Sequence, residues 1–197
     1  MNYPNFFNDI ETIKLKDELS EYLGAFEKGI IEFSYLDIVK SSGHSCPTIA
    51  GAYIMTLKAL KELYKDEMPK RGEIFVSFRE NSKEGVTGVI ANVVTQITGA
   101  TESLGFKGLN GKFERFGLMK FNEDITLSIK FQRLDTKKFV EIIYNPDLIP
   151  LNPKINQLHQ KIRQNRALEE EKIEFGKLWQ ERVNTIFKNI DKVVTII

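Results

Sequence analysis

The hydrophobic positions near the start of the chain alternate between helical and strand spacing. Residues 9–26 repeat apolar side chains three or four positions apart, which predicts a helix that ends before Gly29. The apolar run GIIEF at residues 29–33 is too short for a helix and predicts a short strand. Ser34 then suits the cap of a short helix that ends near Gly43.

Two longer helices are predicted in the middle of the chain. Pro47 suits the first helical position of residues 47–65, where its missing N–H is not needed. Apolar residues mark one face of this helix: Ile49, Tyr53, Leu57, Leu60 and Tyr64. Residues 86–98 carry apolar side chains around most of one side, so we expect this second helix to be buried and to end at Gly99.

Strand patterns surround the second helix. Residues 73–78 alternate apolar and polar side chains, residues 112–121 are predicted as a strand, and residues 124–133 alternate over their whole length. Residues 137–144 are the expected hairpin partner of that last strand. We therefore predict an α+β fold in which an antiparallel sheet packs against two long helices, with a glycine-rich loop over residues 99–111.

The best boundary in the chain lies at residues 145–153, which contain three prolines. Everything beyond it has helical spacing, with one apolar stripe in the last part: Phe175, Trp179, Val183, Ile186 and Ile190. This divides the chain into an α+β core domain over residues 1–150 and a C-terminal helical extension over residues 151–197. Because the stripe is long for a domain of this size, we expect a homodimer.

Composition narrows the class of protein. The chain has 197 residues and a net charge of +1, so it has no overall field that favours nucleic acid or an anionic membrane. Its single cysteine excludes an internal disulfide. The first residues do not follow the pattern of a signal peptide, and no apolar run approaches the length of about 20 residues that spans a bilayer. We expect a cytoplasmic protein.

Candidate chemistry centres on the stretch SGHSCPTIAGAY at residues 42–53. Cys46 lies at or next to the start of the predicted helix, where unpaired amides and the helix dipole stabilise a thiolate. His44 lies two residues earlier, so both side chains can point into one cleft. Thiolate and imidazole are ligands for zinc and other transition metals, which predicts a metal site or a reactive thiolate with a nearby base. The alternative is a structural cysteine at a tight turn and a histidine bonded to backbone.

Other polar residues are weaker candidates. Thr98 and Thr101 flank Gly99 and could contact a bound cofactor. Lys107 and Lys112, with Arg115, lie in the glycine-rich segment GFKGLNGKFER and could hold a phosphate or a carboxylate, although an ordinary loop is the simpler interpretation. Three carboxylates near predicted element ends could serve as ligands or bases, or simply face solvent: Glu32, Glu84 and Glu102.

The segment from Gly43 to Pro47, followed by a helix of small residues, resembles the GHLCPG-type motif of the formylmethanofuran dehydrogenase E-subunit-like family. Residues 98–101 (TGAT) and 111–113 (GKF) are also similar to segments of that family, as is the closing helix, so the resemblance covers roughly residues 30–190. The cysteine of the family's TGCT segment is replaced here by Ala100, and a common first histidine by Ser42.

This resemblance implies an α+β core in which His44 and Cys46 line a metal or active site. Zinc is the first choice of transition metal, and His44 and Cys46 would be both the metal ligands and the catalytic residues. The family name also implies one-carbon metabolism and association with a larger oxidoreductase complex. The second hypothesis is a non-catalytic accessory subunit, or one that binds a small cofactor, in which the His-x-Cys turn is structural.

Overall fold

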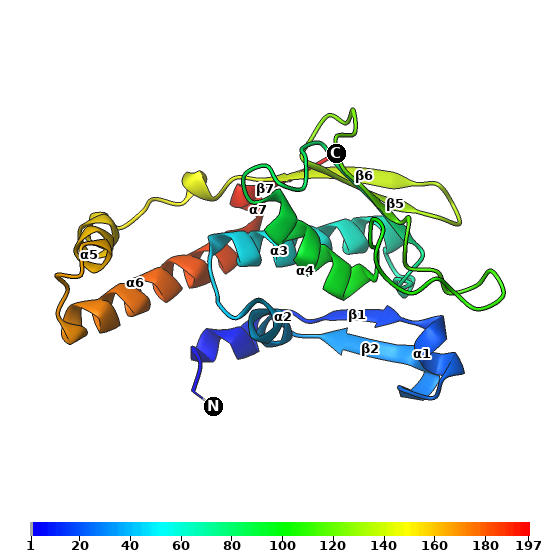
Figure 1. The fold of residues 1–197 in the computed structure, drawn as a ribbon, viewed down its shortest axis with the longest axis horizontal. Coiled ribbons are helices and arrows are strands. Elements are labelled where there is room, and N and C mark those ends of the chain that lie inside the picture. Colours follow the sequence, from blue (N-terminus) through cyan, green and yellow to red (C-terminus); the bar gives the residue numbers. More distant parts are fainter. Residues whose placement is uncertain (1) are drawn as a thin grey trace.

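The computed structural model describes residues 2–197 as three layers stacked around one long helix, α3 (Pro47–Tyr64) (Figure 1). A five-stranded sheet covers one side of α3, and a two-stranded hairpin lies on the other side. The strand order of the large sheet is β4-β3-β5-β6-β7, and the hairpin consists of β1 and β2. The predicted α+β class is confirmed.

The predicted antiparallel arrangement of the sheet is wrong at one edge. β3 (Ile74–Phe78), β5 (Ile129–Arg133) and β6 (Phe139–Tyr144) pair in antiparallel fashion, as expected. β4 (Met119–Lys120), however, pairs parallel to β3. Helix α4 (Thr87–Thr98) and a long loop carry the chain back between these two strands, so β4 runs in the same direction as β3.

The predicted strands around this loop are too long. Residues 112–121 contain only the two-residue β4, because the chain from residue 100 to 118 forms turns and bonds to itself. β5 begins at Ile129, five residues later than predicted. The hairpin of β5 and β6 is confirmed, with Phe131 opposite Val140 in the core.

α3 is buried on most of its circumference, and not on one face only. Thirteen of its 18 residues are buried. β6 packs along one side, and α2 (Tyr35–Ser42), α4 and α6 (Glu169–Phe187) pack along others. Small residues allow these close approaches, and Gly51 lies directly under the ring of Tyr144.

The helix predicted over residues 9–26 is wrong. A short 3₁₀ helix (Asn5–Asp9) is followed by β1 (Ile13–Lys16) and by the single-turn helix α1 (Glu18–Tyr22). A second 3₁₀ turn (Glu27–Gly29) leads into β2 (Ile30–Phe33), which was predicted. Ile13 and Leu15 both enter the core, as alternate residues of a strand do, so the apolar spacing that indicated a helix also fits a strand followed by a turn.

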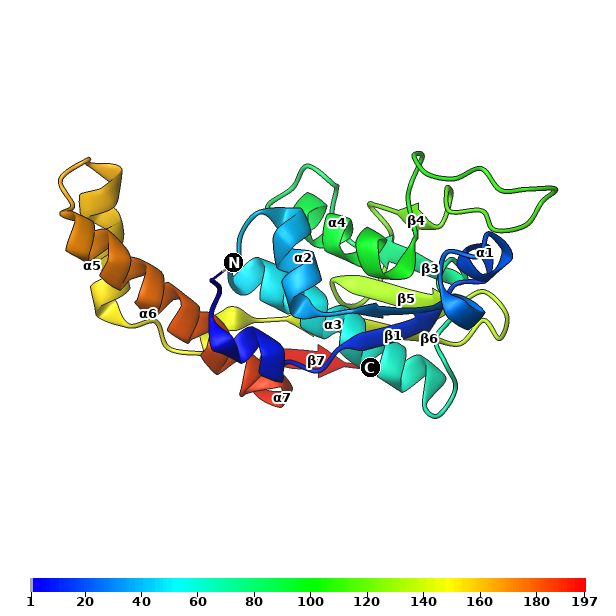
Figure 2. The same ribbon diagram turned by 90° about the horizontal axis from the view of Figure 1, so that it is seen from below.

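The C-terminal segment is helical, as predicted, up to its last residues. After a 3₁₀ turn (Pro146–Leu148), α5 (Pro153–Arg163) packs against α6, and together they project from the core (Figures 1 and 2). α7 (Ile190–Val193) and β7 (Val194–Ile196) were not predicted, and β7 adds to the core sheet beside β6. The domain division near residue 150 and the homodimer stay predictions.

No helix within residues 2–197 has both the length and the apolar character that a membrane-spanning helix needs.

Candidate functional site

The GHSCP turn connects α2 to α3, and local signals shape both ends of it. A capping box of Ser34 and Asp37 starts α2, and Gly43 ends it in the left-handed conformation with φ of 75°. No atom lies within 4 Å of a Cβ built on Gly43, so the backbone conformation, and not space, favours glycine here. Pro47 then occupies the first position of α3.

The Cys46 side chain serves as the N-cap of α3. Its backbone is extended, and its Sγ accepts a hydrogen bond from the backbone N–H of Ile49 at 3.5 Å. The thiol is half-buried and packs against the hydrophobic core. It therefore satisfies one of the free amides at the start of the helix, the role that serine or threonine usually fills.

The His44 ring is exposed and bonds to the turn itself. Its Nδ1 lies 3.0 Å from the carbonyl oxygen of Ser42, so Nδ1–H donates to that oxygen. In the neutral ring this leaves the lone pair of Nε2 for a ligand. Within residues 2–197, no hydrogen bond joins this ring to the Cys46 thiol.

Ser45 fastens the turn to the rest of the molecule. Its carbonyl oxygen accepts from Trp179 Nε1 at 3.2 Å and from Gln180 Nε2 at 3.1 Å, both on α6. Its hydroxyl lies 2.9 Å from the hydroxyl of Tyr35. Sequence reasoning assigned Trp179 to the core or an interface and missed this contact, because the partners are more than 130 residues apart.

Two tyrosines flank the turn, the buried Tyr35 and the half-buried Tyr144. The hydroxyl of Tyr35 contacts Ser45, and that of Tyr144 donates to the carbonyl oxygen of Pro47 at 2.9 Å. Burial raises the pKa of both phenols, and the nearby Cys46 thiol acts in the same direction. Both tyrosines are therefore neutral at neutral pH, and Tyr144 acts as a hydrogen-bond donor.

The residues around the turn do not complete a metal site. Within residues 2–197, no group of three or more His, Cys, Asp or Glu side chains is placed to hold a metal ion. Glu32 bonds to Thr12 and lies 3.6 Å from Lys14 on the β1–β2 hairpin, while Glu84 and Glu102 are exposed in loops. His44 and Cys46 alone supply two donors, fewer than the three or four that hold zinc in proteins.

The other predicted binding residues lie elsewhere. The hydroxyl of Thr98 donates to Val94 inside α4, and the hydroxyl of Thr101 donates to the carbonyl oxygen of Arg115 at 2.7 Å. Lys107 is exposed in the loop, and Lys112 lines a surface cavity of about 460 Å³. These four residues do not converge on one site, and none belongs to the GHSCP turn.

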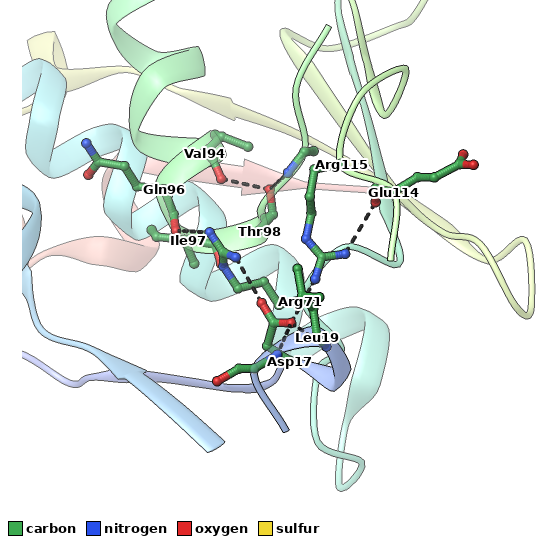
Figure 3. Close-up of polar contacts among 11 residues, drawn as sticks. Asp17, Leu19, Arg71, Val94, Gln96, Ile97, Thr98, Glu114 and Arg115 are labelled. Carbon is green, nitrogen blue, oxygen red and sulfur yellow. Dashed lines mark hydrogen bonds and ion pairs between the residues drawn. The ribbon is translucent and has the colours of Figure 1, made fainter. Parts of the chain in front are cut away.

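Arg115, from the glycine-rich segment, belongs to an ion cluster around the buried carboxylate of Asp17. The Asp17 carboxylate accepts from Arg71 at 2.9 Å and from Arg115 at 2.8 Å (Figure 3). Its Oδ1 also accepts from the backbone N–H of Leu19 and Ser20, and so caps α1. Arg115 therefore pairs with Asp17, and it also lines the surface cavity that Lys112 lines.

Two glycines make room for Arg115. A Cβ built on Gly72 would lie 1.5 Å from Arg115 Nη1, and one on Gly99 would lie 3.0 Å from its Cδ. Both glycines also have left-handed backbone, with φ of 83° and 77°. The Arg115 side chain thus passes between Gly72 and Gly99 and connects the glycine-rich loop to the core.

The two guanidiniums keep Asp17 ionised. Burial alone would raise the pKa of Asp17, but Arg71, Arg115 and the backbone N–H of Ser20 hold it below the ordinary value. Burial lowers the pKa of Arg115, and the charge of Asp17 opposes this change. Because arginine stays cationic, two positive charges face one negative charge in this cluster.

We expect Asp17→Asn to weaken the dependence of the free energy of unfolding on pH in acid. The carboxyl binds a proton less readily in the folded than in the unfolded chain, so its contribution is complete above the unfolded pKa of about 4 and is lost as pH falls through the folded pKa. Urea unfolding at pH 6, 4 and 3 should show that the difference in free energy of unfolding between wild type and variant becomes smaller as pH falls. A gap that stays constant would contradict this assignment.

Fold and turn together define a mixed α+β protein built around one long helix that a His-x-Cys turn opens. The chain belongs to the FmdE family, described as "Molybdenum formylmethanofuran dehydrogenase operon", whose family model matches residues 42–195. The match begins at the GHSCP turn and confirms the resemblance seen in the sequence. No curated protein matches the sequence.

Proposed function

We propose that this protein is a non-catalytic accessory subunit for an oxidoreductase related to formylmethanofuran dehydrogenase, and that its GHSCP turn is structural. The observation that carries the proposal is the position of the Cys46 thiol, which caps α3 through the Ile49 N–H. The bond between His44 Nδ1 and Ser42, and the two α6 donors on Ser45, support the same interpretation. Each group of the turn then has a role in holding α2, α3 and α6 together.

A metal site is the second candidate, because the Nε2 of His44 is exposed and the family description names the operon of a molybdenum enzyme. His44 and Cys46 would then be two of the ligands, and another chain would supply the rest. Within residues 2–197 these two donors do not make a complete site by themselves.

We expect Cys46→Ser to preserve the protein and Cys46→Ala to weaken it. Serine is a strong N-cap and can accept the same Ile49 N–H, whereas alanine cannot, so Cys46→Ala should cost about 1 kcal/mol. His44→Ala should change the free energy of unfolding by less than about 0.5 kcal/mol, because the ring is exposed. Urea unfolding of the three variants measures these effects.

Metal analysis of the same proteins, purified without an affinity tag, separates the two candidates. The structural role predicts substoichiometric metal in wild type and no change in His44→Ala or Cys46→Ser. One metal ion per chain in wild type that both substitutions remove would overturn the structural role and establish the metal site.

A further inference from the structure

A cavity of about 200 Å³ lies next to the GHSCP turn. The hydrogen bonds that hold the turn in place do not explain why this cavity is present. It is partly open to solvent and is lined by residues of α3, the first turn of α4, the ends of β3 and β6 and the start of β5. Most of its wall is apolar: Met55, Phe78, Ile90, Ile129, Tyr144 and Pro146. Val86 also lines it, together with three residues that carry hydroxyls, Thr48, Thr87 and Ser128.

Glu80 contributes the single charge among the described lining residues. It follows β3, and its Oε2 accepts a hydrogen bond from the hydroxyl of Thr87 at 3.0 Å. Thr87 is buried at the first position of α4, so this bond holds the carboxylate at the edge of the cavity. The second oxygen, Oε1, can accept a bond from an occupant.

The volume limits the occupant to a small molecule. An apolar protein cavity of about 150 Å³ holds one benzene molecule, and sites for larger ligands start at about 300 Å³. A cavity of 200 Å³ therefore accommodates one ring or a branched aliphatic group with a short substituent. The lone carboxylate favours a substituent that carries positive charge.

We propose that this cavity binds a small primary amine, with its apolar body against Met55, Ile90 and Ile129 and its ammonium group on Glu80. The Tyr144 ring forms part of the wall, and its hydroxyl donates to Pro47. An occupant would therefore contact the side chain that braces the first turn of α3. The inference rests on this cavity alone and holds whether the GHSCP turn is structural or binds a metal.

Benzylamine is the probe, with benzyl alcohol and benzoate as neutral and anionic counterparts of the same shape. Methyl resonances of Met55, Ile90 and Ile129 should shift and saturate with benzylamine at a dissociation constant of about 1–10 mM, as expected of so small a ligand. Because Glu80 is exposed to solvent, we expect the amine to bind about two- to fivefold tighter than the alcohol. Benzoate should bind more weakly than either.

Glu80→Gln should abolish the preference for the amine while leaving the binding of benzyl alcohol unchanged. Glu84→Gln is the matched control, because Glu84 lies in the same loop but outside the lining. Ile90→Phe fills the cavity and should abolish the binding of all three probes, with Met55 and Ile129 as reporters. The proposal is overturned if no methyl signal moves with benzylamine, if amine and alcohol bind equally, or if Glu80→Gln retains the preference.

Discussion

Asp17→Ala should destabilise the protein by about 3–5 kcal/mol, because it leaves the buried guanidinium of Arg115 and the half-buried one of Arg71 without a counter-charge. The carboxylate also caps α1 through Leu19 and Ser20, so its loss frees backbone donors as well. Urea unfolding at pH 7, followed by circular dichroism, measures the change.

The neighbouring residue provides a matched control. Glu18 is exposed, and its carboxylate lies 4.0 Å from Lys70, so Glu18→Ala should cost less than about 1 kcal/mol. The contrast between adjacent acidic residues tests burial and pairing, not acidity itself. If the two substitutions cost the same, the Asp17 cluster does not hold the fold together as the structure indicates.

The partner of Arg115 in the same cluster could not be predicted from the sequence of the glycine-rich loop. Glycines beside lysines and an arginine are typical of phosphate-binding loops, and Arg115 fits that pattern. Its partner Asp17 lies 98 residues away along the chain, in a segment whose spacing predicts the middle of a helix. An ion pair between residues so far apart in the chain leaves no mark on local spacing, so the sequence alone could not assign either residue to it.

Local sequence signals, in contrast, were sufficient to predict helix ends that are capped by nearby residues. Ser34 caps the start of α2, and Gly43 ends it in the left-handed conformation. Pro47, with its fixed φ, starts α3, and both helices form as predicted. These devices act within a few residues, so they can be recognised in a sequence. The position of His44 and Cys46 at the start of α3 followed from them.

The surroundings of that turn could not be predicted in the same way. The donors on Ser45 come from α6, and the hydroxyl on Pro47 comes from β6. α6 approaches the turn because the chain returns to the sheet through β7, a strand of three residues that carries too little pattern to recognise. The role of the site therefore depends on contacts that only the folded chain reveals.

Gly51→Ala should destabilise the protein by about 1–3 kcal/mol, although alanine favours a helix interior by about 1 kcal/mol over glycine. A Cβ at this position would lie 2.3–2.8 Å from three atoms of the Tyr144 ring. The ring cannot move aside freely, because its hydroxyl donates to Pro47 and its own strand is paired on both sides.

Gly176→Ala is the control for helix propensity. Gly176 lies in the exposed part of α6, and no atom lies within 4 Å of a Cβ built on it. This substitution should therefore stabilise the protein by up to about 1 kcal/mol. If the two Gly→Ala substitutions change the free energy of unfolding in opposite directions, the contact with the Tyr144 ring is the cause of the difference.

A double-mutant cycle with Tyr144→Ala gives the sharper test. In that background the ring is absent, so Gly51→Ala should stabilise the protein as Gly176→Ala does, and its effect should change sign. The cycle measures the packing between α3 and β6 directly, at the contact that also braces the first turn of α3. If Gly51→Ala has the same effect with and without Tyr144, the glycine is not required by the ring, and the close approach of α3 to β6 must have another cause.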